Sequence, residues 1–166
     1  MSDKRREDKE KIDGLLYFPY ILLVGCLFSL DRVVKYFVAS RFFPGESIEV
    51  LKKIFHITLV QNTGIAFGLL RNKSNLSFVL FVLGLMLFSI ILLRGKTYSK
   101  IGKISLCLII SGALSNLFDR LVFGYVIDYL DFRVWPVFNI ADASITAGVA
   151  LIVREIFVKK ESLTLK

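Results

Sequence analysis

Four long runs of apolar residues, separated by polar connections, dominate the pattern of this chain. A helix needs roughly 17–25 mostly apolar residues to cross a bilayer. Two of the runs reach that length alone, and two reach it if the helix continues past an acidic residue, Asp31 or Asp119. The runs cover residues 14–30, 76–93, 104–118 and 134–153.

The pattern predicts a mainly α membrane protein, a bundle of four transmembrane helices with a small β-sheet and loop region outside the membrane. We expect one integral membrane domain over residues 1–166. Its helices are expected at residues 14–37, 75–94, 103–123 and 136–158, and its outer β region at residues 42–74.

Composition agrees with this interpretation, because 55% of the 166 residues are hydrophobic, which exceeds the share in an ordinary soluble domain. A cleaved signal peptide is the alternative for the first run. Residues 1–13 are as acidic as they are basic, and no small-x-small cleavage site follows the run, so we favour an uncleaved helix. Pro19 is expected in its first turns, where a missing N–H does little harm.

Lys and Arg density predicts the orientation. Residues 1–13 hold five of these cations, 94–103 hold four and 154–166 hold four, whereas 37–75 hold five over 39 residues and 124–133 hold one. Basic connections stay in the cytoplasm. We therefore expect a multi-pass membrane protein with both termini cytoplasmic. This sidedness explains the net charge of +8, and we expect no nucleic-acid partner.

Alternating apolar residues in the first outer connection predict short strands with a turn at residues 51–53. We expect the sheet to lie on the membrane surface. His56 is expected at a strand surface without a chemical role. Asn62 and Gly64 are typical of an ordinary turn.

Both cysteines, Cys26 and Cys107, fall within predicted spans and are expected to fill space as small apolar groups. We expect no disulfide. Neither cysteine has a His or acidic residue at ligand spacing, so we expect no metal site and no cofactor.

A set of polar residues remains near the outer ends of the predicted helices, and all of them map to one face of the membrane. Ionisable groups within a membrane are costly and are usually functional. Asn116 and Arg120 share a helical face, as do Asn139 and Asp142. We predict a shared pocket lined by Asp31, Lys35, Asn62, Asn116, Asp119, Arg120, Asp128, Asn139 and Asp142, and we add Gly64 from the turn after Asn62 to its lining.

Part of this set has a simpler explanation. Asp31 and Lys35 lie four residues apart, and an ion pair between these two residues alone explains their presence as well as the shared pocket does. Asp119 and Arg120 also fit an interfacial pair with a cation that reaches to the surface.

Two acids resist such an explanation. Asp128 and Asp142 have no basic residue three or four positions away, so each needs a partner elsewhere in the fold. Asp131, by contrast, is expected in a solvated loop. Two carboxyl groups that meet share a proton, because both cannot easily ionise together. Such a pair can activate water and polarise a carbonyl, which predicts an aspartic dyad that hydrolyses amides.

Four segments of the chain resemble one family, bacterial lipoprotein signal peptidase, also called signal peptidase II. They are LDRVVK at 30–35, QNTGIAFG at 61–68, SGALSNLFDRLVFGYVIDY at 111–129 and FNIADASI at 138–145. The resemblance spans most of the chain outside the charged termini. It departs from the family pattern at Ile65, Ser115 and Tyr129, which remove no catalytic group.

The resemblance implies that Asp128 and Asp142 are the catalytic residues and that the other members of the set line the substrate pocket. It implies cleavage of diacylglyceryl-modified prolipoproteins just before the lipidated Cys, on the extracytoplasmic side of the bacterial inner membrane. It also implies binding of globomycin-type inhibitors. Membrane lipid surrounds the chain, and we expect a monomer.

Two other functions are compatible with part of the pattern. An ion-coupled carrier would use the acids as a relay, but acids on one face offer no path to the other side. A non-catalytic assembly factor would leave the polar set without a purpose.

Overall fold

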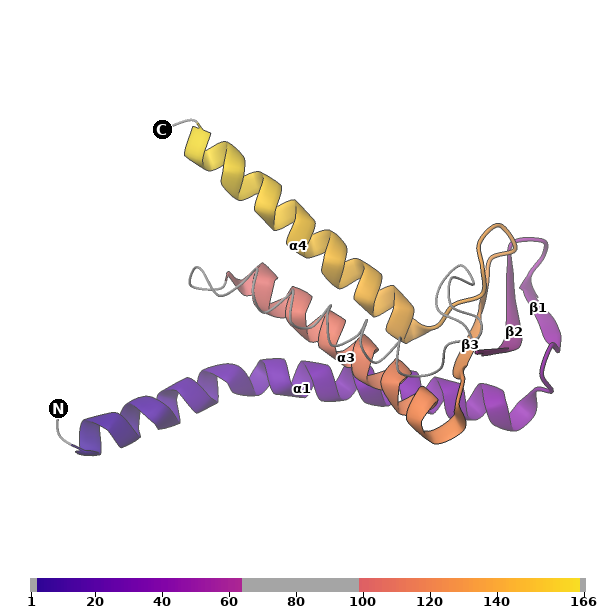
Figure 1. Cartoon of the computed structure of the whole chain (residues 1–166), viewed down its shortest axis with the longest axis horizontal. Coiled ribbons are helices and arrows are strands. Elements are labelled where there is room, and N and C mark those ends of the chain that lie inside the picture. Colours follow the sequence, from indigo (N-terminus) through magenta and orange to yellow (C-terminus); the bar gives the residue numbers. More distant parts are fainter. Residues whose placement is uncertain (1–2, 64–98, 165–166) are drawn as a thin grey trace.

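The computed structural model describes residues 3–63 and 99–164, with side chains for 17–63 and 99–158. Three long helices and a three-stranded sheet make up this part of the chain (Figure 1). The helices converge beside the sheet and spread apart toward the two termini, which lie at the same end (Figure 1). The predicted helix at residues 75–94 lies outside the described residues.

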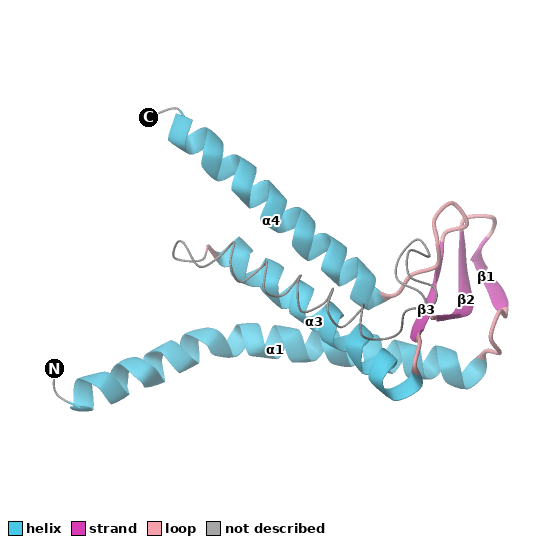
Figure 2. Cartoon of the chain, viewed as in Figure 1, coloured by secondary structure: helices cyan, strands magenta, loops and turns pink. Residues whose placement is uncertain are grey.

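The first helix, α1, spans Asp3–Arg41 and is longer at both ends than the sequence predicts. Our expectation that Pro19 would fall in its first turns is wrong, because the helix begins sixteen residues earlier and Pro19 lies in its interior. There the proline ring removes one backbone hydrogen bond. The helix curves over this N-terminal half, as Figure 2 shows.

The other two helices overlap their predicted ranges, although the last one begins four residues later and ends six residues later than predicted. The helix α3 spans Lys100–Phe123, with Ser99 capping its start and Gly124 ending it in a left-handed conformation at φ 80°. The helix α4 spans Ile140–Thr164. Among the described helices, α3 is long and apolar enough, by length and composition, to cross a membrane.

The strands β1 (Ser47–Leu51), β2 (Phe55–Asn62) and β3 (Val126–Asp131) form an antiparallel sheet in the order β1-β2-β3. The predicted turn after Leu51 joins β1 to β2 as a hairpin, in which Lys53 has a positive φ of 60°. A bulge between Ile57 and Val60 shifts the register of β2 against β3. The sheet therefore joins two strands that precede α3 in the sequence to one strand that follows it.

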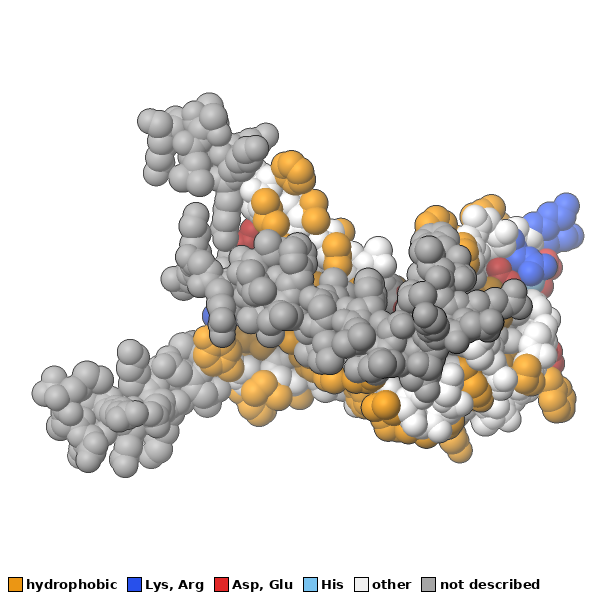
Figure 3. All heavy atoms as spheres, viewed as in Figure 1, with side chains coloured by type: hydrophobic (Ala, Val, Ile, Leu, Met, Phe, Trp, Pro, Cys, Tyr) orange, Lys and Arg blue, Asp and Glu red, His pale blue; other side chains and the backbone are white. Residues whose placement is uncertain are grey.

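The apolar core of the described residues is small. Val38 of α1 packs there against Leu59, Ile127 and Tyr129 of the sheet. Many large apolar side chains instead point outward along the helices, as Figure 3 shows for the face in view. On α1, Phe18 is 61% exposed and Ile21 is 68% exposed. Apolar helix surfaces of this kind are suited to contact with lipid.

Candidate active site

Asp128 and Asp142 reach the site from two different elements. Asp128 is the third residue of β3 and is 1% exposed, and Asp142 lies in the first turn of α4. Both oxygens of Asp128 accept hydrogen bonds, Oδ2 from Asn62 Nδ2 at 2.8 Å and Oδ1 from Asn139 Nδ2 at 2.7 Å. Asp142 Oδ1 accepts one from Asn116 Nδ2 at 2.7 Å.

Asn139, the residue before α4, contacts both acidic residues. Its Oδ1 accepts the backbone N–H of Asp142 at 2.8 Å, which is the bond of a helix N-cap. Its Nδ2 donates to the side chain of Asp128. The Asn139 amide therefore caps the helix that carries Asp142 and also holds the carboxylate of Asp128. The two carboxyl groups lie close enough to interact electrostatically.

Asn116 of α3 makes the same kind of link from the opposite side. Its Nδ2 donates to Asp142, and its Oδ1 accepts from Lys35 Nζ at 2.9 Å and from Asn139 Nδ2 at 3.1 Å. The amide oxygen thus faces a cation while the amide nitrogen faces an acid. Exchanging the amide oxygen and nitrogen would place a donor against Lys35 and an acceptor against Asp142, so these partners fix the orientation of the Asn116 side chain.

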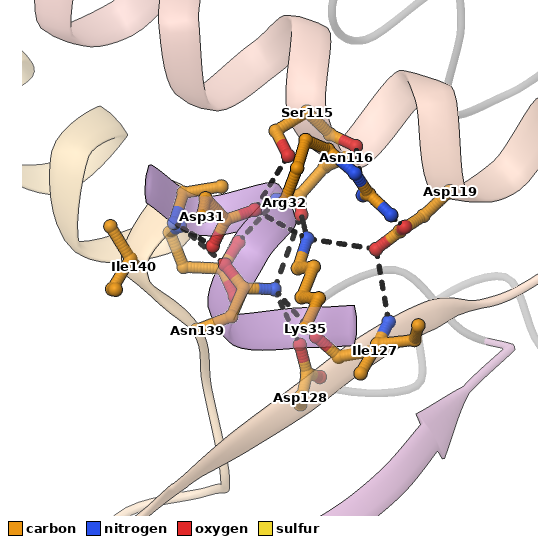
Figure 4. Close-up of polar contacts among 12 residues, drawn as sticks. Asp31, Arg32, Lys35, Ser115, Asn116, Asp119, Ile127, Asp128, Asn139 and Ile140 are labelled. Atoms are coloured by element: carbon orange, nitrogen blue, oxygen red, sulfur yellow. Dashed lines mark hydrogen bonds and ion pairs between the residues drawn. The ribbon is translucent and has the colours of Figure 1, made fainter. Parts of the chain in front are cut away.

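Beneath the two amides lies a buried group of charges, drawn in Figure 4. Lys35 is fully buried and contacts Asp31 Oδ2 at 2.9 Å and Asp119 Oδ2 at 2.8 Å. Arg32 pairs with Asp119 Oδ1. The i,i+4 pair of Asp31 and Lys35 exists as predicted, but it is part of a network that joins α1 to α3.

The start of α4 is anchored through its backbone. The first N–H groups of a helix lack partners within the helix. Here Ile140 N donates to the hydroxyl of Tyr129 at 3.3 Å, Ala141 N donates to Asp31 Oδ1 at 3.1 Å, and the N–H of Asp142 bonds to its cap. The Asp31 carboxylate therefore places Asp142 through the preceding peptide and also complements the positive end of the helix dipole.

A glycine allows α3 to approach α4 at this level. A Cβ built on Gly112 would lie 2.3 Å from the backbone oxygen of Ala141, the residue before Asp142. No side chain fits there, so the absence of one at Gly112 allows the two helices to lie this close. Gly148, deeper in the bundle, has a similar contact at 2.7 Å to Ser105 O.

Burial is the main reason why the pKa of the Asp128 carboxyl group is raised. Desolvation, aided by the nearby charge of Asp142, raises its pKa to about 7, although hydrogen bonds from Asn62 and Asn139 and the charge of Lys35 oppose the shift. Desolvation likewise raises the pKa of the Tyr129 hydroxyl, and the nearby Asp31 adds to the effect. A carboxyl group with a pKa near neutrality can both give and take a proton at physiological pH.

Arg120 is the remaining cation of the predicted set. It is buried on α3 and interacts electrostatically with Asp128, Asp142 and Asp119. The sequence places Gly64 in the pocket as well, but that residue lies outside the described part of the chain, and so does Ile65.

Two expectations about the sheet are wrong. His56 does lie on a strand, but it is buried, with Nε2 3.5 Å from Glu49 Oε2 and with Nδ1 lacking a hydrogen-bond partner among the described residues. Asp131 is not a solvated loop residue, since it is 4% exposed at the end of β3 and accepts a hydrogen bond from Thr58 at 2.7 Å. Partial burial raises the pKa of Asp131, but the bonds from Thr58 and Arg133 outweigh it and leave the pKa lowered.

Three residues of the site were not predicted from the sequence to belong to it. They are Arg32, Ser115, whose hydroxyl donates to Asp31, and Tyr129, whose hydroxyl lies 3.5 Å from Asp31. Asp31 itself was predicted from the sequence. Ser115 and Tyr129 can be identified through their contacts with Asp31, but these contacts exist only in the folded chain. Within the described ranges, no group of three or more His, Cys, Asp and Glu residues is arranged to hold a metal ion.

Comparison with known proteins places this arrangement in a family. The model of the family described as signal peptidase (SPase) II matches residues 23–158. A lipoprotein signal peptidase of Moorella thermoacetica is 44% identical over 138 residues, which cover 81% of this chain and 89% of that protein. The lipoprotein signal peptidase of Clostridioides difficile is 40% identical over 131 residues, which cover 78% of this chain and 88% of that one.

Solved structures agree with the sequence comparison. A bacterial membrane enzyme determined by the in meso method at 2.3 Å resolution superposes with a TM-score of 0.78 at 29% identity, over 87% of this chain and 90% of that one. The resemblance noted from the four sequence segments is thereby confirmed. The chain belongs to the signal peptidase II family, and it is an aspartic peptidase of the membrane.

Proposed function

We propose that this chain is an endopeptidase in which Asp128 and Asp142 form the catalytic dyad. The observation that carries the proposal is the side chain of Asn139, which binds the carboxylate of Asp128 and the backbone N–H of Asp142 at the same time. This link keeps the two acids in one site although they come from a strand and a helix. It is the kind of rigid support that a catalytic pair requires.

The substrate is a diacylglyceryl-modified prolipoprotein, cut just before the lipidated Cys. Family membership supports a prolipoprotein as the class of substrate. The signal segment of such a substrate lies in the bilayer, so the cut falls at the membrane edge, on the extracytoplasmic side in our proposal. Asn62 and Arg120 face the dyad and are suited to bind backbone carbonyl groups of the substrate.

The chemistry follows from one shared proton. The ionised member of the dyad takes a proton from water as the water oxygen attacks the scissile carbonyl carbon, and the protonated member gives its proton to the carbonyl oxygen. In the collapse of the resulting tetrahedral diol, the now protonated Asp gives its proton to the amide nitrogen, a diol hydroxyl gives its proton to the now ionised Asp, and the C–N bond breaks. The products are a carboxylic acid and an amine, and the dyad again holds one proton.

The test is cleavage of a lipidated precursor by purified protein in detergent. Asp128→Asn and Asp142→Asn are each expected to lose cleavage by a factor on the order of 10³ or more, because neither can replace the proton-transfer role of the carboxylate. The matched control is Asp131→Asn, an acid of the same strand whose partners are Thr58 and Arg133 and which should cleave close to the wild-type rate. Globomycin should inhibit the wild type.

Wild-type cleavage by either dyad variant, with the protein folded, would refute the proposed mechanism. Cleavage that survives globomycin would refute the proposed inhibitor binding and leave the dyad intact. We further propose that the enzyme acts as a monomer, because residues of one chain are enough to give both acids of the dyad hydrogen-bond partners.

A further inference from the structure

Arg32 of α1 is a mostly buried cation that has no role in the proposed chemistry. Its Nη1 pairs with Asp119 Oδ1 and lies 3.5 Å from the backbone oxygen of Ser115. Its guanidinium carbon lies 4.6 Å from the centre of the Phe118 ring, a cation–π contact. The side chain is 18% exposed, so three contacts with α3 hold a mostly buried guanidinium in one orientation.

Asp119 connects Arg32 to β3, the strand that carries Asp128. Its Oδ1 faces Arg32, and its Oδ2 accepts from Lys35 at 2.8 Å and from the backbone N–H of Ile127 at 3.1 Å. Ile127 directly precedes Asp128 in β3. Figure 4 shows Asp119 between Arg32 and Ile127. The Asp119 carboxylate therefore holds the backbone of β3 one residue before Asp128.

The charges of the same cluster are nearly balanced. In this cluster, among the residues that the structure describes, four carboxyl groups face three cations. The facing groups are Asp31, Arg32 and Lys35 from α1, Asp119 and Arg120 from α3, Asp128 and the neutral hydroxyl of Tyr129 from β3, and Asp142 from α4. The sum is zero when one of the four carboxyl groups is protonated. Asp31 and Asp119 lie directly against cations, so that proton belongs to the dyad.

We propose that Arg32 is a positioning residue of the active site: through Asp119 it holds the backbone before Asp128, and its charge helps to leave the dyad with a single proton. The inference rests on the proposed function, because it assigns Arg32 a role in the chemistry of that dyad. Arg32 touches no reacting atom.

The sign of the expected effect follows from electrostatics. Without Arg32, the charge of Asp119 is balanced by Lys35 alone, which must also balance Asp31. The added negative field favours protonation of the dyad, so both limbs of the pH–rate profile move to higher pH. A less firmly held Asp119 also loosens the peptide before Asp128, which lowers kcat more than it changes KM.

The experiment compares Arg32→Gln and Arg32→Lys with the wild type in the precursor cleavage assay, over a range of pH. For Arg32→Gln we expect kcat to fall about tenfold with KM nearly unchanged, and both limbs of the profile to rise by about half a unit to one unit. Arg32→Lys keeps the charge and should restore the limbs to their wild-type positions. Arg41→Gln is the matched control, since Arg41 is an exposed residue at the end of the same helix and should leave the profile unchanged.

A folded Arg32→Gln protein with the wild-type pH profile would overturn the inference, even if its thermal stability were reduced, because a purely structural contact predicts that outcome. If Arg32→Gln fails to fold, Arg32→Lys decides, and limbs shifted upward in that charged variant would contradict the charge role. Failure of the proposed function looks different, because Asp128→Asn would then retain cleavage. An inactive Asp128→Asn beside an unshifted Arg32→Gln would refute this inference alone.

Discussion

Asn139 does two tasks with one side chain, and this is why no other residue type fits its position. The oxygen of the amide caps α4 at Asp142, while the nitrogen donates to Asp128. Asp would supply the cap but not the donor, and Ser would be too short to reach β3. The residue is also fully buried, so each of its polar atoms needs a partner.

The pH dependence of stability should report the environment of Asp128. Its pKa in the folded protein is raised to about 7, whereas an unfolded Asp titrates near 3.9. The folded state therefore binds more protons between these values, and the free energy of unfolding falls as pH rises from about 4 to about 7. Asp128→Asn removes this group, so its thermal midpoint in detergent should decline less over that interval.

The measurement is thermal unfolding of wild type and Asp128→Asn at matched pH values, with Asp131→Asn as control. Asp131 has a lowered pKa, which gives the opposite sign, so its removal should not flatten the decline. Parallel curves for the wild type and Asp128→Asn would show that Asp128 is not held in a desolvating site.

Most residues of the site can be predicted from the sequence, but few of their contacts can. Polar residues near the ends of apolar runs are conspicuous, which is how Asp31, Asn116 and Asn139 were found. Arg32 was missed because a basic residue beside an acid is typical of a solvated helix face. Its partner Asp119 lies 87 positions away, and only the packing of α1 against α3 brings the two together.

Among the elements, the contact of α3 with α4 depends on glycines. Gly112 lets the backbone of α3 lie against Ala141, and Gly148 repeats the contact further along the pair. Small residues at such positions are common where helices pack within membranes. Because Asp142 follows Ala141, the distance between these helices sets the position of one acid of the dyad.

Gly112→Ala should therefore damage activity more than folding. The new methyl group would lie 2.3 Å from a backbone oxygen, so α4 must move. Overpacking of this kind costs about 1–3 kcal/mol of unfolding free energy, and a displacement of about 1 Å in Asp142 lowers cleavage on the order of 100-fold.

Gly25→Ala is the matched control, because a Cβ at Gly25 of α1 meets no described atom within 4 Å. Cleavage rates and thermal midpoints of both variants should be measured together. Equal activity of the two variants would show that the close approach at Gly112 does not position Asp142.

The sequence predicted the positions of the helices and strands better than it predicted which side chains of the sheet are buried. Apolar runs and the glycine at 124 locate α3 within a few residues, because helix length and capping are local properties. The burial of His56 and Asp131 could not be found in this way. They pair across β2 and β3, and the bulge after Ile57 that alters this register has no clear sign in the sequence.

For the whole molecule, the described polar network joins α1 and α3 to β3 and to the start of α4. In Figure 1, β3 and the start of α4 lie at the sheet end of the bundle, and the termini lie at the other end. We propose that the sheet end is extracytoplasmic, as the distribution of Lys and Arg predicts. This orientation has a direct test.

Cysteine labelling of intact cells provides it. In a background without Cys26 and Cys107, a single cysteine at Lys52, in the β1–β2 turn, should react with a membrane-impermeant maleimide added outside. A cysteine at Lys100, the exposed start of α3, should react only after the membrane is opened. The reverse pattern would invert the proposed orientation and place the dyad on the cytoplasmic side.

The central claim is that Asp128 and Asp142 act as one catalytic unit. Residues that act as a unit have strongly non-additive effects. The most direct test is kcat/KM for lipidated precursor of Asp128→Asn, Asp142→Asn and the double variant, all shown to be folded. The account predicts that the double variant is about as inactive as either single variant. Losses that multiply, or wild-type activity in either single variant, would contradict it.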